Sequence, residues 1–550
     1  MITQLTLRPA IHFKWNRMCT LALVLAILIA LVPQVSASNL IPHAQPVLLE
    51  LAKQQPDRPI SVIVQKNSAE STVEQALSGM GGKITRDFSI IKGFAAELPA
   101  SRITELSTLP GVKWVSLDSP VVKSVCADCA ATTAPWDIEI NANDVWNNSS
   151  GTASQYQGQG ITVAVLDSGI AKGLGDFSNY NGAGNRVINQ IKLNSSTNNM
   201  NDGYGHGTLV AGIIGSNGSL SNNAYVGVAP QVNLINVKVT DDNGAASSSD
   251  VVSGMQWIYN YNQGLSQTDP TRIRVVNISM NNSVASTYDT DPLCAAAEIL
   301  WFNGVVVVTS AGNNGTSTLY APANDPFVIT VGAADDKGTT SLSDDAVASF
   351  SAYGTITTSV NGLPTVITKP DLVAPGRYIF SDVQSNAGII NGHTSYLKDS
   401  SCLTSSTPCF LKVSGTSFAA PMVSGAAALL LQSNPNLNPD QVKYRLKATA
   451  LQSAARGTWD KRTLWKGYNA STAGAGYLDI QAAINQTGIT GSANLGYSAS
   501  LLLTTGLSPV NLIWGSVNWT SVNWTSVNWT SVNWTSVNWT SVNWTSDYWG

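Results

Sequence analysis

Three side chains that could carry out nucleophilic catalysis lie beside glycine, each next to a segment with an apolar pattern. Asp167 ends the β-branched run of residues 161–167 and is followed by Ser-Gly. His206 lies in Gly-Tyr-Gly-His-Gly, at the start of a segment of small residues. Ser417 lies in Ser-Gly-Thr-Ser-Phe-Ala-Ala-Pro, before another apolar segment. A hydroxyl, an imidazole and a carboxylate are the groups that acyl transfer needs as nucleophile, general base and orienting group.

The stretch around Ser417 predicts a glycine turn that opens a buried helix. Free N–H groups and the positive end of the helix dipole would favour the negative charge that develops when Ser417 attacks a carbonyl. We expect Pro421 in the first turn of this helix, where proline is tolerated without its N–H. Taken alone, the stretch fits a plain N-cap serine equally well.

The position of Asp167 favours the catalytic interpretation. Its run is typical of a buried parallel strand, and open α/β sheets place their sites at the carboxyl ends of such strands. The order Asp167, His206, Ser417 is also one of the chain orders in which catalytic triads occur.

Strand patterns alternate with helix patterns through this part of the chain. The expected strands are residues 161–166, 232–239, 274–279, 305–310 and 328–332, and the expected helices are 250–260, 294–302, 439–450 and 480–485. This alternation predicts an α/β fold, a mostly parallel sheet with helices on both faces.

The motifs resemble those of the subtilisin-like serine proteases, the subtilases. Asp-Ser-Gly, His-Gly-Thr-x-Val-Ala-Gly and Gly-Thr-Ser-x-Ala-x-Pro all occur in the family's order, and Ser-Ala-Gly-Asn-Asn-Gly at 310–315 matches its oxyanion-hole segment. The resemblance covers roughly residues 135–486. Leu209 and Met422 stand where many relatives carry histidine, which affects subfamily and fine geometry rather than the triad.

The resemblance implies a role for each matching position. Asp167, His206 and Ser417 would form the triad, and Asn313 with the Ser417 N–H would form the oxyanion hole. Two segments would bind the substrate, and they supply Ser279, Met280, Asn281, Ser310, Ala311 and Gly312. The small residues of these segments, with Met280 nearby, predict a roomy, apolar pocket. Because the segments contain no acidic residue, nothing in them requires a basic substrate side chain.

The N-terminal part indicates export and a pro-domain. Residues 1–37 read as a signal peptide, with an uncleaved anchor as the alternative. Residues 38–58 are expected to be a spacer, and 59–123 predict a ferredoxin-like β-α-β-β-α-β unit. This unit resembles the subtilase pro-domain, which assists folding and then inhibits the enzyme. Self-cleavage should fall between Lys123 and Pro135, so that the peptidase domain occupies 124–487.

The C-terminal part consists of a connector, 488–514, and a short repeat tail, 515–550, in which Ser-Val-Asn-Trp-Thr occurs six times. A period of five places successive tryptophans on opposite faces of a strand, so no single apolar face forms. The tail is therefore a flexible segment, a surface-adhesion element that contacts the cell surface or envelope, or a sorting signal. The irregular segment 381–411 is either a rim of the substrate site or surface decoration.

Cysteine usage and composition limit the other functions. A local disulfide between Cys402 and Cys409 is expected in an exported chain; Cys126 and Cys129 could form a small ring or a metal site, and Cys294 is left over. Only 12% of residues are charged and the net charge is −4, which does not favour nucleic-acid binding. The chemistry needs no cofactor; structural Ca²⁺ stays unassigned, because Asp241-Asp242 and Asp335-Asp336 are equally typical of solvated turns.

The sequence therefore predicts a secreted serine endopeptidase, made as a zymogen that processes itself. Polypeptides would be its substrates, its own pro-domain its intramolecular inhibitor, and a monomer its state. One alternative is a protease dedicated to processing a single exported partner. Another is an inactive scaffold of the same fold used for surface adhesion.

Overall fold

A computed structural model describes residues 42–68, 70–123, 136–147, 156–179, 184–339, 342, 344–452, 468–488 and 490–503. All of its helices and strands belong to the unit Ala44–Gly550. The expected signal peptide, Cys126, Cys129 and the tryptophan repeats lie outside the described residues. None of the described helices combines the length and the apolar character needed to cross a membrane.

The N-terminal module is a four-stranded antiparallel sheet with the order β2-β3-β1-β4. Its elements are α2 (Pro46–Gln54), β1 (Pro59–Lys66), α3 (Thr72–Gly79), β2 (Lys83–Phe88), β3 (Gly93–Pro99), α4 (Ile103–Ser107) and β4 (Val112–Leu117). From β1 onward they follow the strand–helix–strand–strand–helix–strand order that the sequence predicts. Val62, Val64 and Phe94 belong to a separate buried cluster that forms the core of this module.

The expected spacer is wrong, because it contains helix α2. Pro46 begins the helix, where a missing N–H costs nothing, and Leu48 is fully buried in the core of the module. The Gln45 N–H donates to the carbonyl of Val115 on β4 at 2.9 Å. The module therefore begins near residue 44 rather than at 59.

The large domain is built on an eight-stranded sheet, ordered β14-β13-β12-β10-β6-β8-β7, with β17 also paired to β13. All pairs are parallel except β13 with β14. Its strands are β6 (Thr162–Asp167), β7 (Val187–Lys192), β8 (Asn233–Lys238), β10 (Ile273–Ile278), β12 (Val306–Ser310), β13 (Ile329–Asp335), β14 (Ala346–Val347) and β17 (Leu372–Pro375). Smaller sheets are formed by β5 (Pro120–Lys123), β9 (Ala246–Ser247) and β11 (Met280–Asn282), by β15 (Gly354–Val360) and β16 (Leu363–Lys369), and by β18 (Ile379–Val383) and β19 (Cys409–Val413).

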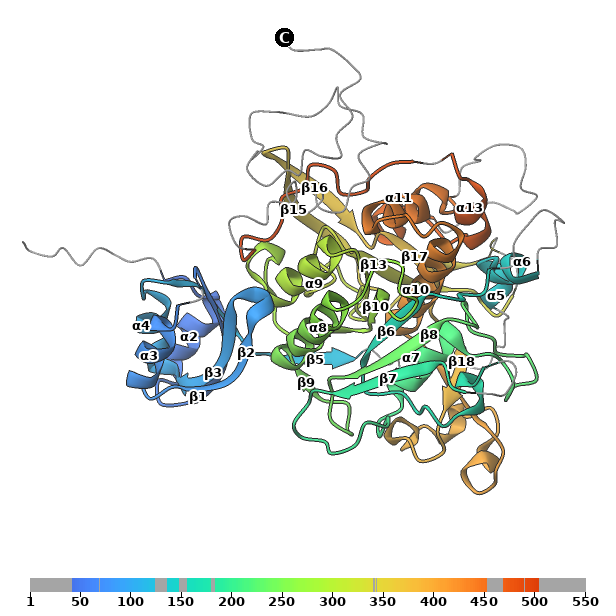
Figure 1. Cartoon of the computed structure of the whole chain (residues 1–550), viewed down its shortest axis with the longest axis horizontal. Coiled ribbons are helices and arrows are strands. Elements are labelled where there is room, and N and C mark those ends of the chain that lie inside the picture. The colour runs from blue at the N-terminus through green and yellow to red at the C-terminus, as the bar shows by residue number, and fades with distance from the viewer. Residues whose placement is uncertain are drawn as a thin grey trace, which may run out of the picture. The chain divides into compact units, whose positions relative to one another are not determined.

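Helices pack on the large sheet in two pairs. The helices of the domain are α5 (Trp136–Glu139), α6 (Ala142–Asn147), α7 (His206–Gly215), α8 (Ser248–Gln263), α9 (Pro292–Phe302), α10 (Thr416–Ser433), α11 (Pro439–Thr449), α12 (Ala470–Ala473) and α13 (Ile480–Asn485). Helix α7 packs against α10, and α8 lies beside α9 (Figure 1). Every residue of α7 is buried, as are the first sixteen of α10, so both helices belong to the core.

The boundary expected at 487 and the irregular segment 381–411 both need correction. The connector packs on the domain up to residue 503, because Leu502 and Leu503 are buried and the Ser500 N–H donates to Glu298. The segment 381–411 includes most of the β18–β19 hairpin, with short 3₁₀ turns between the strands. Local sequence did not reveal either feature, because both depend on tertiary contacts.

A buried cluster of carboxyl groups, Glu139, Asp336 and Asp345, lies near Tyr477. The Tyr477 hydroxyl donates to Glu139 Oε2 at 2.9 Å, and Glu139 is 3% exposed. Burial, together with the charges of Asp336 and Asp345, raises the pKa of Glu139 to about 10. Burial and the Asp336 charge likewise raise the pKa of Asp345 to about 7. The folded protein therefore holds protons that the unfolded chain would release above its ordinary carboxyl pKa.

We expect Glu139→Gln to increase thermal stability at alkaline pH. A carboxyl whose pKa is raised in the fold stabilises it fully below the unfolded pKa, about 4.5, and this contribution is lost as pH rises toward about 10. Glutamine keeps an oxygen acceptor for Tyr477 but does not ionise. The Tm of the variant should match wild type near pH 5 and exceed it at pH 9. Asp399→Asn, at an exposed carboxyl of the peptidase domain, is the control, and an equal gain there would contradict the explanation.

Candidate active site

The structure brings Asp167 and His206 together at the carboxyl edge of the large sheet. Asp167 is the last residue of β6, and His206 is the first residue of α7. His206 Nδ1 lies 2.9 Å from Asp167 Oδ1 and 3.0 Å from Oδ2, and both side chains are fully buried. This contact orients the imidazole, so that Nε2 is the atom that can exchange a proton with a nucleophile.

The glycine after the histidine is required for this approach. A Cβ on Gly207 would lie 2.2 Å from the carbonyl oxygen of Gly169, in the turn that follows β6. The Gly207 N–H donates to Ser168 Oγ at 2.9 Å. The backbone of the His-Gly motif and the backbone of the Asp-Ser-Gly motif are therefore in direct contact.

Asp202 is a site residue that our reading of the sequence missed. Its Oδ1 accepts the Gly205 N–H at 2.7 Å, and its Oδ2 accepts the N–H and the hydroxyl of Thr208 at 2.8 and 2.7 Å. It therefore caps the first turn of α7. The signal in the sequence is an aspartate shortly before a small-residue helix, which is a common capping pattern.

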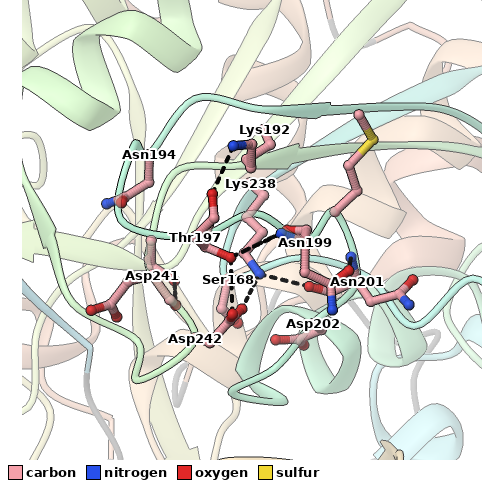
Figure 2. Close-up of polar contacts among 12 residues, drawn as sticks. Ser168, Lys192, Asn194, Thr197, Asn199, Asn201, Asp202, Lys238, Asp241 and Asp242 are labelled. Atoms are coloured by element: carbon pink, nitrogen blue, oxygen red, sulfur yellow. Dashed lines mark hydrogen bonds and ion pairs between the residues drawn. The ribbon is translucent and has the colours of Figure 1, made fainter.

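Lys238, at the end of β8, supports the loop that leads to Asp202. Its buried ammonium donates to the carbonyl of Asn201 at 2.7 Å and pairs with Asp242, which also accepts the Thr197 hydroxyl at 2.9 Å (Figure 2). Asp241 accepts N–H groups of its own turn. Among the described residues, no group of three or more His, Cys, Asp or Glu side chains is arranged to hold a metal ion.

Ser417 is the second residue of α10 and is fully buried. Its hydroxyl donates to the carbonyl of Ser279 at 3.1 Å, whereas His206 Nε2 has no hydrogen-bond partner in the part of the chain that the structure describes. The His206 ring lies 5.2 Å from the Phe418 ring, so the imidazole adjoins the residue after Ser417. Transfer of the Ser417 proton to His206 Nε2 would need a rotation of the Ser417 hydroxyl. Catalytic hydrogen bonds of this kind often form fully only when substrate binds.

The expected place of Pro421 is wrong, and the reason concerns Ser417. Pro421 is the sixth residue of α10, inside the helix rather than in its first turn. Proline has no N–H, so it cannot donate to the carbonyl four residues earlier, which is that of Ser417. The Ser279 hydroxyl donates to this carbonyl instead, at 2.8 Å.

The Ser279 side chain is itself held by hydrogen bonds from Asn277 and, through it, Ser424. Asn277 Nδ2 donates to the Ser279 hydroxyl at 2.8 Å, and the Ser424 hydroxyl, two turns along α10, donates to Asn277 Oδ1 at 2.9 Å. The Ser279 side chain, which the sequence assigned to substrate, therefore holds the start of α10.

Asn313 lies beside the residue that precedes Ser417. Its Oδ1 accepts the N–H and the hydroxyl of Thr416 at 2.9 and 2.8 Å, and the Thr416 hydroxyl also accepts the Gly312 N–H at 3.0 Å. The carbonyl end of the Asn313 amide is thereby fixed against Thr416, the residue before Ser417.

The other residues expected to bind substrate are mostly part of the framework. Met280 is fully buried and belongs to the main core. Asn281 Nδ2 donates to the carbonyl of Ser310 at 2.9 Å, and the Ala311 N–H donates to β13 at Val331. These two segments therefore support one another and the sheet.

Strand β5 lies between β9 and β11 as the central strand of an antiparallel sheet. Val121 is opposite Asn282, and Lys123 is opposite Met280, one residue from Ser279. The N-terminal module is also fixed to helix α8: Asp118 accepts the N–H and the hydroxyl of Ser249 at 2.8 and 2.6 Å. Burial raises the pKa of Asp118, although the bonds from Ser249 oppose this.

The β18–β19 hairpin carries a disulfide between Cys402 and Cys409, with a Cα–Cα distance of 5.3 Å. Cys294 is buried in α9 and forms no disulfide with another cysteine of the described residues. His393 is partly buried, and its Nδ1 lies 2.9 Å from the carbonyl oxygen of Ile389.

A carboxylate and an imidazole at the edge of a mostly parallel α/β sheet, with a serine at the start of the helix that packs against α7, are typical of α/β serine hydrolases. A family model described as the subtilase family matches residues 158–477. The chain belongs to this family of serine peptidases, whose catalysis needs no cofactor.

Individual relatives agree with this assignment. Serine protease AprX of Bacillus subtilis (strain 168) is 37% identical over 334 residues, 60% of this chain and 66% of AprX, so the match spans just under two thirds of that relative. Subtilisin E of the same strain is 31% identical over 395 residues, 70% of this chain and 83% of that protein. The crystal structure of fervidolysin from Fervidobacterium pennivorans, a keratinolytic enzyme related to subtilisin, matches the fold with a TM-score of 0.54 at 24% identity, covering 78% of this chain and 61% of that one.

We expect Gly207→Ala to reduce kcat/KM by more than about 100-fold, because the new methyl group would separate α7 from the turn after β6 and lengthen the His206–Asp167 contact. The measurement is peptide hydrolysis, with circular dichroism to verify folding. Gly173→Ala is the matched control, since nothing lies within 4 Å of a Cβ at that position. Comparable kinetics for the two variants would contradict this role of Gly207.

Proposed function

We propose that the protein is a serine endopeptidase that works through Asp167, His206 and Ser417. The observation that carries this proposal is the buried Asp167–His206 contact at the start of α7, which packs against the helix that begins at Ser417. Ser417 would attack the scissile carbonyl while His206 Nε2 takes its proton. The acyl-enzyme forms as His206 returns that proton to the leaving amine, and water then hydrolyses the ester by the same route.

Asn313 and the Ser417 N–H would stabilise the tetrahedral intermediate. The negative charge develops on the former carbonyl oxygen, near the start of α10, where the helix dipole also favours it. The fixed orientation of the Asn313 amide supports this role, because a donor held in place needs no reorganisation when the charge appears.

Asn313→Ala should lower kcat by roughly 100- to 1000-fold with little change in KM, the range typical of losing one oxyanion donor. The measurement is steady-state hydrolysis of a peptide substrate by folded, titrated enzyme. Asn314→Ala, at the exposed neighbour, is the control. An Asn313→Ala enzyme with wild-type kcat would exclude Asn313 as the donor.

We also propose that the chain is an exported zymogen whose pro-domain comprises the N-terminal module and the strand β5 that follows it. The support is the position of β5 between β9 and β11, where an extended substrate would add as a strand. Cleavage would fall between Lys123 and Pro135, shortly after the end of β5. The pro-domain would remain an inhibitor as long as β5 keeps this place.

Ser417→Ala should accumulate with residues 38–123 still attached, whereas wild type should lose them. The reason is that self-cleavage needs the nucleophile. The measurement is mass spectrometry of protein secreted from a host that lacks extracellular proteases. Ser414→Ala, close in sequence but outside the proposed triad, is the control. Maturation of Ser417→Ala at the wild-type rate would show that another protease makes the cut.

The same site could serve broad degradation or the processing of one exported partner. The apolar residues and the absence of acidic residues in the substrate segments favour broad cleavage of extended polypeptides. The tryptophan repeats, with amphipathic rings at regular spacing, would provide contact with a cell surface or envelope.

A further inference from the structure

We infer that residues 384–389, in the insertion between β18 and β19, form a positioning element for His206. The inference rests on the proposed function, because it concerns how the general base is held. These residues lie about 180 positions after His206 in the chain, and nothing in the motifs connects the two.

The backbone of this segment pairs with the loop that presents His206. The Gly388 N–H donates to the carbonyl of Gly203 at 2.9 Å, and the Ile389 N–H donates to that of Tyr204 at 2.8 Å. The Gln384 side-chain amide donates to the carbonyl of Asp202. Three successive carbonyls before the histidine therefore accept from the insertion.

Two side chains of the segment pack against Gly205, the residue before His206. Gly205 has a φ of +104°, and a Cβ there would lie 2.7 Å from Ala387 Cβ and 2.9 Å from Ile389 Cγ2. Ala387 and Ile389 are 2% and 4% exposed, so this contact is part of the core. The insertion thus fills the space that a side chain at 205 would need.

The loop is held from a second direction as well. Lys238 donates to the carbonyl of Asn201 and pairs with Asp242 (Figure 2). A Cβ at Gly203 would lie 2.7 Å from Asp242 Oδ1, so Asp242 also packs against the loop before His206. The base of the insertion is fixed to α7, because the Ser381 hydroxyl on β18 donates to the carbonyl of Leu209 at 2.8 Å. A change at 384–389 would therefore move the histidine loop relative to Asp167 rather than move both together.

The expected consequence is kinetic rather than only structural. His206 Nδ1 contacts Asp167, and its reach toward Ser417 depends on where residues 203–205 place the start of α7. Displacements near 1 Å at such a centre cost about 100-fold in rate. A partial loss of packing should therefore reduce kcat at each active site, while substrate binding along β9 and β11 stays intact.

The test compares Ile389→Ala, Ile389→Val and Ile390→Ala. Ile390 is 3% exposed, as buried as Ile389, but it is not among the closest side chains to Gly205, so its truncation is a matched control for lost packing. Active sites are counted with a serine-directed titrant, and kcat and KM for a peptide substrate are expressed per titrated site, together with Tm.

Ile389→Ala should lower kcat per site about tenfold, with KM within about twofold of wild type. Ile389→Val should retain most of the wild-type kcat. Ile390→Ala should keep the wild-type kcat, although its Tm falls by a similar amount. Equal kcat per site for the two alanine variants would overturn the inference. If wild type itself fails to react with the titrant, the proposed function is refuted and the inference with it. An active wild type with indistinguishable variants refutes only the inference.

Discussion

The arrangement of the site depends on one close contact between two backbones. Helix α7 begins against the turn that follows β6, at a distance that leaves no room for a side chain on Gly207. The Asp167–His206 contact is a consequence, because Asp167 lies two residues before Gly169 and His206 lies directly before Gly207, the two glycines that touch. Asp202, Lys238 and the segment 384–389 hold the start of α7 in this place from different directions. A strongly stabilised framework thus surrounds a contact that tolerates little change.

A second constraint concerns helix α10. A proline inside a helix leaves a carbonyl without its usual donor, and here that carbonyl belongs to Ser417. The Ser279 hydroxyl supplies the missing bond, and its own carbonyl accepts the Ser417 hydroxyl. The proposed nucleophile and the segment that continues into β11 are therefore joined by two hydrogen bonds, so the orientation of one depends on the other.

The sequence predicted well what is determined locally. The glycine-flanked motifs, the alternating strand and helix patterns and the strand that ends at Asp167 all depend on neighbouring residues, and the structure has them. Helix α2 was missed because its leucines are buried only by packing on the N-terminal sheet, a tertiary contact that the local sequence does not show. The place of Pro421 was missed because it is tolerated only through the Ser279 hydroxyl, which donates to the carbonyl of Ser417, 138 positions further along the chain. The role of Ile389 and Gln384 could not be read for the same reason: their partners lie in a loop distant in the chain.

The central position of β5 also determines what can take its place. Both of its edges are used, by β9 on one side and by β11 on the other, over residues Pro120 to Lys123. A polypeptide that occupied this position would have to be extended, with both of its edges free to form hydrogen bonds. A helix is not extended, and a strand inside a folded sheet already has both edges paired. The local conformation of a target would therefore be selected before its sequence, and natively unfolded segments, long loops and denatured chains would be preferred over intact globular domains.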